Sequence, residues 1–181
     1  QPGIDTEWNI HRITHTDYPA IIRCFVKTKF FHFPLYKELN AKSNFMIPFK
    51  DITLADKDTI TSFTMKSERR NCDLSFSNLC SWRFLYDTQF AVVDNFLVFK
   101  FWAGEQLAYM MPVGTGDLKA VLWELIEDAR KENQHFCMLG VCSNMRADLE
   151  AILPEQFTFT EDRDYADYIY LRSDLSKLKG K

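Results

Sequence analysis

Apolar residues recur three and four positions apart over residues 118–129, which is the clearest periodic pattern in the chain. This spacing places them on one face of a helix, so the pattern predicts an amphipathic helix. An apolar stretch typical of a strand, residues 107–113, precedes it. Gly114, Thr115 and Gly116 interrupt the strand, and Asp117 can cap the helix by accepting hydrogen bonds from the free N–H groups of its first turn. The helical face consists of Leu118, Val121, Leu122, Leu125, Ile126 and Ala129.

The chain from residue 46 onward contains further predicted helices and strands. Thr53 and Asp56 resemble a capping box, which predicts a helix over about residues 54–68. Asp73 or Ser75 can cap a second helix, and Asp94-Asn95 has the composition of a hairpin turn. The other expected helices are 76–86 and 146–153, and the expected strands are 47–52, 90–93, 96–101, 106–113, 135–141, 157–160 and 165–171.

The order of these elements predicts the fold class. Three consecutive strands are followed by alternating strands and helices. This order indicates an α/β (α+β) fold, in which a mixed, partly antiparallel sheet has helices on both faces.

Residues 1–45 differ from the rest of the chain. They carry a net charge of +2, with six Lys/Arg against four Asp/Glu, and their apolar clusters keep no sustained period. Because the pattern becomes coherent at Met46, our hypothesis is that Met46 is the natural first residue and that 1–45 is an upstream extension. The alternative is a genuine N-terminal subdomain. The main domain is expected to span residues 46–181.

The amino-acid composition limits which classes of function are possible for this chain. With 46% apolar and 26% charged residues, the 181-residue chain can bury an ordinary globular core. The net charge of −3 argues against a general nucleic-acid binder, although it leaves room for a local basic patch. No apolar run approaches the roughly 18 residues of a membrane span, so we expect none.

The five cysteines are an odd number without CxxC spacing, and no histidine lies near them at metal-binding spacing. We therefore expect reduced thiols, no metal site and a cytoplasmic location. They are Cys24, Cys72, Cys80, Cys137 and Cys142.

The glycine loop is a candidate phosphate site. Backbone N–H groups of Gly114, Thr115, Gly116 and Asp117 at a helix start can cradle an anion. The other interpretation is a glycine turn that lets the strand enter the helix. Asp117 favours the turn, because a carboxylate at this position repels a phosphate.

A polar cluster between the first two predicted helices is a candidate substrate site. It comprises Arg69, Arg70, Asn71 and Asp73, and a guanidinium there can bind a carboxylate or phosphate in a fork. The alternative is that these residues only end and cap helices. A later acidic run, residues 161–167, could supply a general base but is also typical of a solvated turn.

Four segments, residues 71–82, 101–102, 109–117 and 161–170, resemble the bacterial family called phosphatidylglycerol lysyltransferase C-terminal-like. The element order is similar to that of the GNAT acyltransferase fold. The resemblance covers about residues 46–181 and includes Tyr109, which we add to the candidate substrate-binding residues. The catalytic residues stay unassigned.

The resemblance implies a tandem of two GNAT-like halves, of which this chain would be the first. Characterised relatives move an aminoacyl group from aminoacyl-tRNA to the headgroup of phosphatidylglycerol. The implied partners are a second half or a second copy, aminoacyl-tRNA and anionic lipid, and the donor could also be acyl-CoA. The usual polar residue that leads a CoA loop is replaced by Met111.

Two functional hypotheses follow. In the first, the chain is half of an acyl- or aminoacyltransferase and is inactive in isolation. In the second, it is a non-catalytic scaffold that docks another GNAT-like domain or self-associates. An exposed apolar face is expected for the scaffold.

Overall fold

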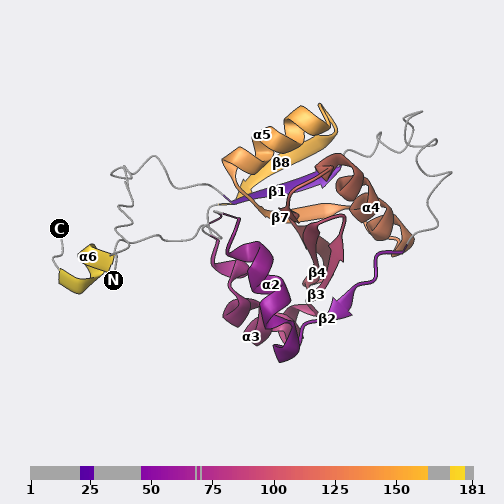
Figure 1. Cartoon of the computed structure of the whole chain (residues 1–181). Helices are drawn as coiled ribbons and strands as arrows, with labels where there is room; N and C mark the ends of the chain where they lie inside the picture. Colours follow the sequence, from indigo (N-terminus) through magenta and orange to yellow (C-terminus); the bar gives the residue numbers. More distant parts are fainter. Residues whose placement is uncertain (1–20, 27–45, 68, 70, 163–171, 178–181) are drawn as a thin grey trace.

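A mostly antiparallel sheet of eight strands forms the centre of the computed structural model, which describes residues 21–26, 46–67, 69, 71–162 and 172–177 (Figure 1). The strand order is β2-β3-β4-β5-β7-β1-β8, and β6 pairs with β4 outside this path. Among the described strands, β5 and β7 are the one pair that runs in parallel. The predicted mixed α/β class is confirmed.

A three-strand meander forms one half of the sheet. It consists of β3 (Gln89–Val93), β4 (Phe96–Ala103) and β5 (Gln106–Met110). The turn between β3 and β4 is the predicted one: Asp94 and Asn95 take positive φ angles of 44° and 64°, as a tight primed turn requires.

Two of the other strands, β2 and β6, have only two residues each. β2 is Lys50–Asp51 and pairs with β3, and β6 is Val113–Gly114. β7 spans Cys137–Val141 and β8 spans Phe157–Asp162. The expected strand over 165–171 lies outside the described residues.

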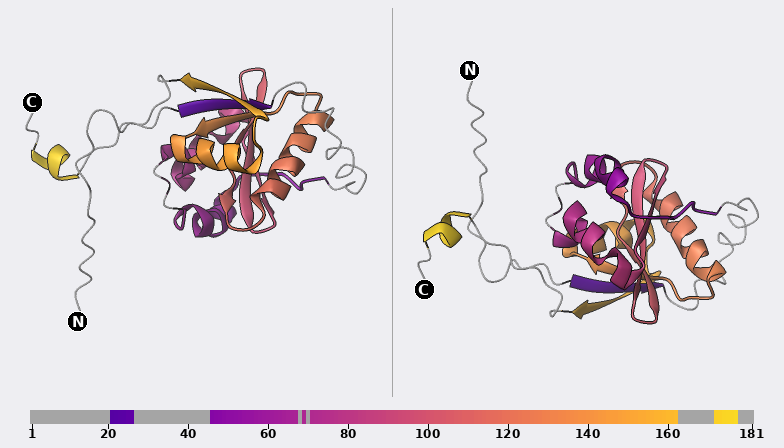
Figure 2. Two further views of the ribbon diagram at one scale, coloured as in Figure 1. Left: turned by 90° about the horizontal axis from the view of Figure 1, so that it is seen from above. Right: turned by 90° about the horizontal axis from the view of Figure 1, so that it is seen from below.

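Helices cover both faces of the sheet (Figures 1 and 2). Alternate residues of a strand point to opposite faces. Phe96 and Val98 of β4 therefore lie in a core with α4 (Leu118–Lys131) and α5 (Ser143–Ile152). Leu97 and Phe99 belong to a second core on the opposite face, which contains residues of α2 (Lys57–Thr64) and α3 (Phe76–Tyr86).

The predicted caps are present. Thr53 and Asp56 form a capping box before α2, through a short 3-10 turn over Leu54–Asp56. Ser75 caps α3 by accepting a hydrogen bond from the N–H of Asn78. A second 3-10 turn, Cys72–Leu74, precedes it.

Helix α2 ends earlier than the expected residue 68. Its last turn is closed by tighter bonds, in which the N–H groups of Lys66 and Ser67 donate to the carbonyls of Phe63 and Thr64. The Ser67 hydroxyl also donates to the carbonyl of Thr64. Such hydroxyl bonds to the backbone compete with continued helix.

The predicted strand over 106–113 is divided in two. β5 ends at Met110, and the chain rejoins the sheet as β6, where Val113 pairs with Leu97 of β4. Pro112 lies in the gap and has no N–H to donate to a ladder. This break opens the sheet beside β7.

Part of the segment 1–45 lies inside the sheet. Residues 21–26 form β1 (Ile21–Val26), which pairs antiparallel with both β7 and β8. Cys24 at its centre is fully buried in the larger core. The start of the natural chain at Met46 stays a prediction, but β1 packs with the domain that follows.

The short helix α6 (Arg172–Lys177) is the last described element. None of the helices in the described ranges combines the length and apolar character needed to cross a bilayer.

Candidate functional site

A cavity of about 580 Å³ lies on the α3 side of the sheet. Strands β1, β4, β5 and β7 form its floor, and α3 forms its wall together with Arg69, Asn71, Asp73 and Leu74. Most of the lining side chains are apolar or aromatic, with a few polar groups, which is the usual composition of a small-molecule site. The polar and charged members are Arg23, Arg69, Asn71, Asp73, Asn78, Thr88 and Gln106.

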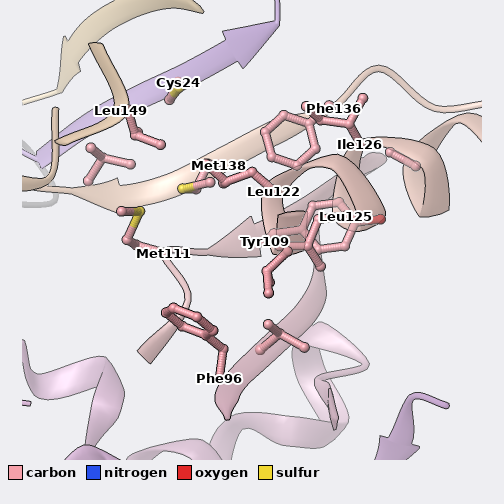
Figure 3. Close-up of a cluster of buried hydrophobic side chains, with 14 of the residues drawn as sticks. Cys24, Phe96, Tyr109, Met111, Leu122, Leu125, Ile126, Phe136, Met138 and Leu149 are labelled. Atoms are coloured by element: carbon pink, nitrogen blue, oxygen red, sulfur yellow. The ribbon is translucent and has the colours of Figure 1, made fainter. Parts of the chain in front are cut away.

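Strand alternation selects which residues line the cavity. Phe25 of β1 and Leu139 of β7 face it. Their neighbours Cys24 and Met138 point to the opposite core under α4 and α5 (Figure 3). Along β1 and β7 the cavity and the main core therefore lie on opposite faces, and they meet at Met111 and Met145, which line the cavity and also belong to that core.

The cavity reaches the point where β5 and β7 separate. Their parallel pairing covers only Tyr109 with Met138 and Met110 with Leu139. Beyond it the chain turns toward β4. Met110, Met111 and Leu139 line the cavity here, so the opening between the strands forms one end of it.

Arg69 lies at this opening. Its Nη1 donates a 2.8 Å hydrogen bond to the carbonyl of Met111, and its Nη2 donates a 2.7 Å bond to the carbonyl of Pro112. These carbonyls belong to the segment that leaves the parallel pairing. Arg69 therefore ties the helical side of the cavity to the strand break.

Arg69 is half-buried. Burial lowers the pKa of its guanidinium, while Cys142 and Asp148 act in the opposite direction. No described carboxylate forms an ion pair with it. Buried charges are normally paired or bind a ligand, so Arg69 is the strongest anion-binding candidate in the cavity.

Asn71 and Asp73 also line the cavity, but both take part in local capping. Asn71 Oδ1 accepts a 2.8 Å hydrogen bond from the N–H of Asp73. Asp73 Oδ1 accepts a 3.2 Å bond from Asn78 Nδ2. Arg69, Asn71 and Asp73 of the predicted cluster thus lie together at the cavity, and Asn71 and Asp73 also cap the local turn. Arg70 lies outside the described residues.

Tyr109 does not line the cavity. It is fully buried on the opposite face, where its ring stacks on Phe136 at 5.4 Å between centroids (Figure 3). Its hydroxyl donates a 2.7 Å bond to Asp128 Oδ2, and burial raises its pKa. Tyr109 therefore occupies a core position.

The glycine loop does not line the cavity either. A Cβ on Gly114 would lie 2.1 Å from the carbonyl oxygen of Asn95, and Gly116 has a φ of +143°. Asp117 Oδ1 accepts a 3.1 Å bond from the N–H of Ala120, so a carboxylate already caps α4. These features are those expected of a glycine turn.

Sequence reasoning missed several lining residues. Trp82 and Tyr86 are one helical turn apart on α3 and form a tilted aromatic pair with centroids 6.3 Å apart. Arg23 and Phe25 come from β1, which had no clear period. Only the i, i+4 spacing of Trp82 and Tyr86 was a usable signal in the sequence.

The cysteines are free thiols. Cys137 lines the cavity, and burial raises its pKa to about 12, which keeps the thiol protonated and weakly nucleophilic. Burial likewise raises the pKa of Cys24. Among the described residues, no group of three or more metal-ligating side chains lies together.

Comparison with known proteins agrees with the resemblance seen in the sequence. A solved structure from Bacteroides thetaiotaomicron VPI-5482, described as a conserved protein of unknown function, is 88% identical with a TM-score of 0.72. The match covers 75% of this chain and 46% of that one, so this chain spans less than half of its length. No curated protein matches. The family model "Phosphatidylglycerol lysyltransferase, C-terminal" matches residues 64–181, and the chain therefore belongs to that family.

Proposed function

We propose that this chain is a GNAT-like half of an acyl- or aminoacyltransferase and that the cavity holds part of its substrate. The observation that carries the proposal is the position of the cavity, beside the parallel strands β5 and β7 where they separate. Ligands of open α/β sheets commonly bind where neighbouring strands diverge in this way. Membership of the lysyltransferase-related family supports transfer chemistry.

The proposed reaction is direct transfer. An acceptor hydroxyl or amine attacks the carbonyl carbon of an activated acyl ester or thioester, a new ester or amide bond forms, and the bond to the donor breaks. The acceptor loses a proton, and the departing tRNA oxyanion or CoA thiolate takes one up. Most of the rate enhancement would come from holding the two reactants close together in the correct relative orientation.

Asp73 is proposed to accept the proton. It is the one carboxylate among the described residues that line the cavity. The bond from Asn78 fixes one of its oxygens. A carboxylate held in this way can act as a general base when an acceptor lies within hydrogen-bond reach.

Donor binding and transfer test the proposal. The chain is titrated with lysyl-tRNA and with a medium-chain acyl-CoA, and transfer is followed to phosphatidylglycerol vesicles or to hydroxylamine, a small acceptor. We expect saturable binding of one donor, lost in Leu139→Trp, which fills the cavity, and kept in Val92→Trp, which lies on exposed β3 surface.

The longer Bacteroides protein serves as the reference for transfer. Activity in that protein, together with donor binding by this chain, would support a half-site. If neither donor binds this chain and the longer protein transfers neither group, the transferase proposal is wrong. Asp73→Asn keeps the local capping geometry and separates proton transfer from donor binding.

The second candidate function is a non-catalytic docking scaffold, and helix α3 favours it. Phe84 is 79% exposed and Leu85 66% exposed, and the guanidinium of Arg83 stacks on Phe84 at 3.9 Å. Exposed apolar clusters of this kind often mark interaction sites. Partners would be a second GNAT-like domain or another copy of this chain.

Light scattering and hydrophobic-dye binding test the scaffold. Self-association that is abolished in the Phe84→Ser, Leu85→Ser double variant would support it. A monomer that binds no dye would contradict it.

A further inference from the structure

Helix α3 presents one row of side chains to the cavity. Asn78, Trp82 and Tyr86 all line it, and their spacing of four residues places them one above another on one face of the helix. Successive members of the row are therefore roughly 6 Å apart along the helix axis. The row begins with an amide and continues with two aromatic rings.

Asp73 lies at the amide end of this row. Its Oδ1 accepts a 3.2 Å hydrogen bond from Asn78 Nδ2, and it is the one carboxylate among the described residues that line the cavity. A carboxylate can only accept hydrogen bonds, and it repels another anion. This end of the row therefore favours a ligand group that donates hydrogen bonds, such as an amine.

The aromatic part of the row is open to a ligand. Trp82 is 51% exposed and Tyr86 40% exposed, and their rings are tilted by 42° with centroids 6.3 Å apart. Such a pair leaves ring faces and edges against which a third ring can pack. Phe101 of β4 also lines the cavity, and so does Gly104, where an added Cβ would meet no atom within 4 Å. The lining thus offers ring surface together with space for a ligand ring.

The two arginines of the lining affect the protonation of a bound amine. Both terminal nitrogens of Arg69 donate to the carbonyls at the strand break, so these groups hold the backbone. The positive charges of Arg69 and of Arg23 on β1 disfavour a further cation in the cavity. A bound amine therefore gives up its proton more readily, and the neutral amine is the form that attacks an acyl carbon.

We propose that the acyl acceptor in this cavity is a small arylalkylamine, a primary amine joined to an aromatic ring by a short carbon chain. Its nitrogen lies at Asp73 and its ring packs against Trp82. Because Trp82 is one helical turn beyond Asn78, a chain of about two carbon atoms fits the spacing. The inference rests on the proposed function, because it uses the same cavity and the same base, and it names the class of acceptor.

The reaction with such an acceptor forms an amide. The neutral amine nitrogen attacks the acyl carbon of the ester or thioester, a C–N bond forms, and the bond from that carbon to the donor oxygen or sulfur breaks. Asp73 takes one proton from the nitrogen, and the departing oxyanion or thiolate takes one up. The products are the amide and the free hydroxyl or thiol of the donor.

Calorimetric titration of the unmodified chain tests the class of acceptor. Phenethylamine carries both groups, butylamine lacks the ring, 2-phenylethanol lacks the amine, and 3-phenylpropionate has an anion in place of the amine. We expect phenethylamine to bind roughly threefold more tightly than each of the others, because an aromatic contact contributes beyond the area that it buries. Tighter binding of 3-phenylpropionate would overturn the inference, because the arginines and not Asp73 would then select the ligand.

The length of the carbon chain gives a second test. Benzylamine, phenethylamine and 4-phenylbutylamine place the ring at increasing distance from the nitrogen. The affinity should be highest for phenethylamine if nitrogen and ring occupy fixed positions one helical turn apart. An affinity that rises steadily with chain length would reflect apolar burial alone and would contradict the proposed fit.

Variants test the two ends of the ligand separately. Asp73→Asn should remove the preference for phenethylamine over 2-phenylethanol, and Asp58→Asn, at an exposed position outside the cavity lining, should keep it. Trp82→Ala should weaken the binding of phenethylamine roughly threefold and leave that of butylamine unchanged. Phe84→Ala is the matched control, because Phe84 is an exposed aromatic residue of the same helix that does not line the cavity.

Circular dichroism checks that each variant folds. A folded Asp73→Asn or Trp82→Ala variant with unchanged ligand preference would overturn the inference. Amine binding without transfer of any acyl group, by this chain or by the longer Bacteroides protein, would count only against the proposed function. Transfer to another acceptor, with no binding of phenethylamine, would count only against this inference.

Discussion

The backbone of Gly114 lies directly against the carbonyl of Asn95, so that a Cβ atom on the glycine would come within 2.1 Å of that oxygen. It would also lie 2.8 Å from the Cα of Phe96. Both neighbours are backbone atoms of the β3–β4 turn region and cannot move aside as a side chain could. The glycine is therefore required by the approach of two backbone segments, whether or not the loop binds a ligand.

Replacing Gly114 with alanine should destabilise the protein. The added methyl group forces the loop away from the turn, and overpacking of this kind costs about 1–3 kcal/mol. Urea denaturation followed by circular dichroism measures the loss. Thr115→Ala, at the exposed neighbouring position, should change the stability little.

The same loop can be tested for phosphate binding. If CoA titration of the unmodified chain gives a heat that disappears in a folded Gly116→Val variant, the phosphate-cradle interpretation is correct and the turn interpretation is incomplete.

The stability prediction for Gly114 has its own contrary outcome. An unchanged denaturation midpoint in Gly114→Ala would contradict the close approach of Gly114 to Asn95.

Tyr109→Phe should lower stability without affecting the cavity. The hydroxyl donates to Asp128, which also pairs with Lys100 at 3.3 Å, and all three side chains are largely buried. Removing the donor leaves a buried carboxylate with one partner fewer, a loss of about 1–2 kcal/mol. Thermal unfolding measures it, and Tyr86→Phe, at a half-exposed position, is the control.

Donor binding, measured with lysyl-tRNA and a medium-chain acyl-CoA, distinguishes a structural Tyr109 from a substrate-binding one. The affinity should be the same in Tyr109→Phe and in the unmodified chain, because the residue faces the α4 side. Weaker binding in Tyr109→Phe, with unchanged stability, would show that Tyr109 belongs to the substrate site.

The sequence revealed the elements whose signals are local. The capping residues Thr53 and Ser75 lie within three residues of their partners, and the apolar face of α4 repeats within one helix. Such patterns depend on the nearest turns alone and can be recognised before the fold is known.

The sequence could not reveal features that depend on distant segments. Arg69 bonds carbonyls 42 and 43 positions away, and no side-chain pattern marks a backbone acceptor. Tyr109 and Met110 are adjacent, but only Met110 faces the cavity, because the strand alternates and the sheet has a core on each face. Assigning the site face required knowing which helices cover which side.

Asp56→Ala should weaken the start of α2. The carboxylate accepts bonds from Lys50 Nζ at 2.6 Å, from the Thr53 hydroxyl at 2.7 Å and from the Thr53 N–H at 2.9 Å. Losing such a cap costs about 1 kcal/mol at neutral pH. Thr53→Val should lower the unfolding free energy by part of this amount. The double variant should lose less than the sum of the two single losses, because both changes break the same hydrogen-bond network.

The effect of Asp56 should depend on pH. The hydrogen bonds from Lys50 and then Thr53 lower the pKa of Asp56 to about 2. A lowered folded-state pKa means that the stabilisation is present above the ordinary carboxyl pKa and is lost as the pH falls toward 2. The difference in unfolding free energy between Asp56→Ala and the unmodified chain should therefore shrink in acid. A constant difference would show that the charge contributes nothing.

Glu124→Gln should stabilise the protein at alkaline pH. Oε2 of Glu124 is buried and has no hydrogen-bond partner in the described part of the chain. Burial, and secondly the negative charge of Asp94, raise the pKa of this carboxyl. A raised carboxyl pKa means that folding is favoured when the group is protonated and that this contribution is lost as the pH rises through the folded-state value.

Melting temperatures at pH 4, 6 and 8 test this prediction. Glutamine keeps the shape of the side chain without the charge, so Glu124→Gln should melt higher than the unmodified chain at pH 8 and nearly the same at pH 4. Asp94→Asn should act in the same direction because it removes the neighbouring charge, and Glu105→Gln, at an exposed position, should have little effect. If Glu124→Gln melts lower at pH 8, the ionised carboxylate is favourable in the fold, and a cation or donor must then reach it.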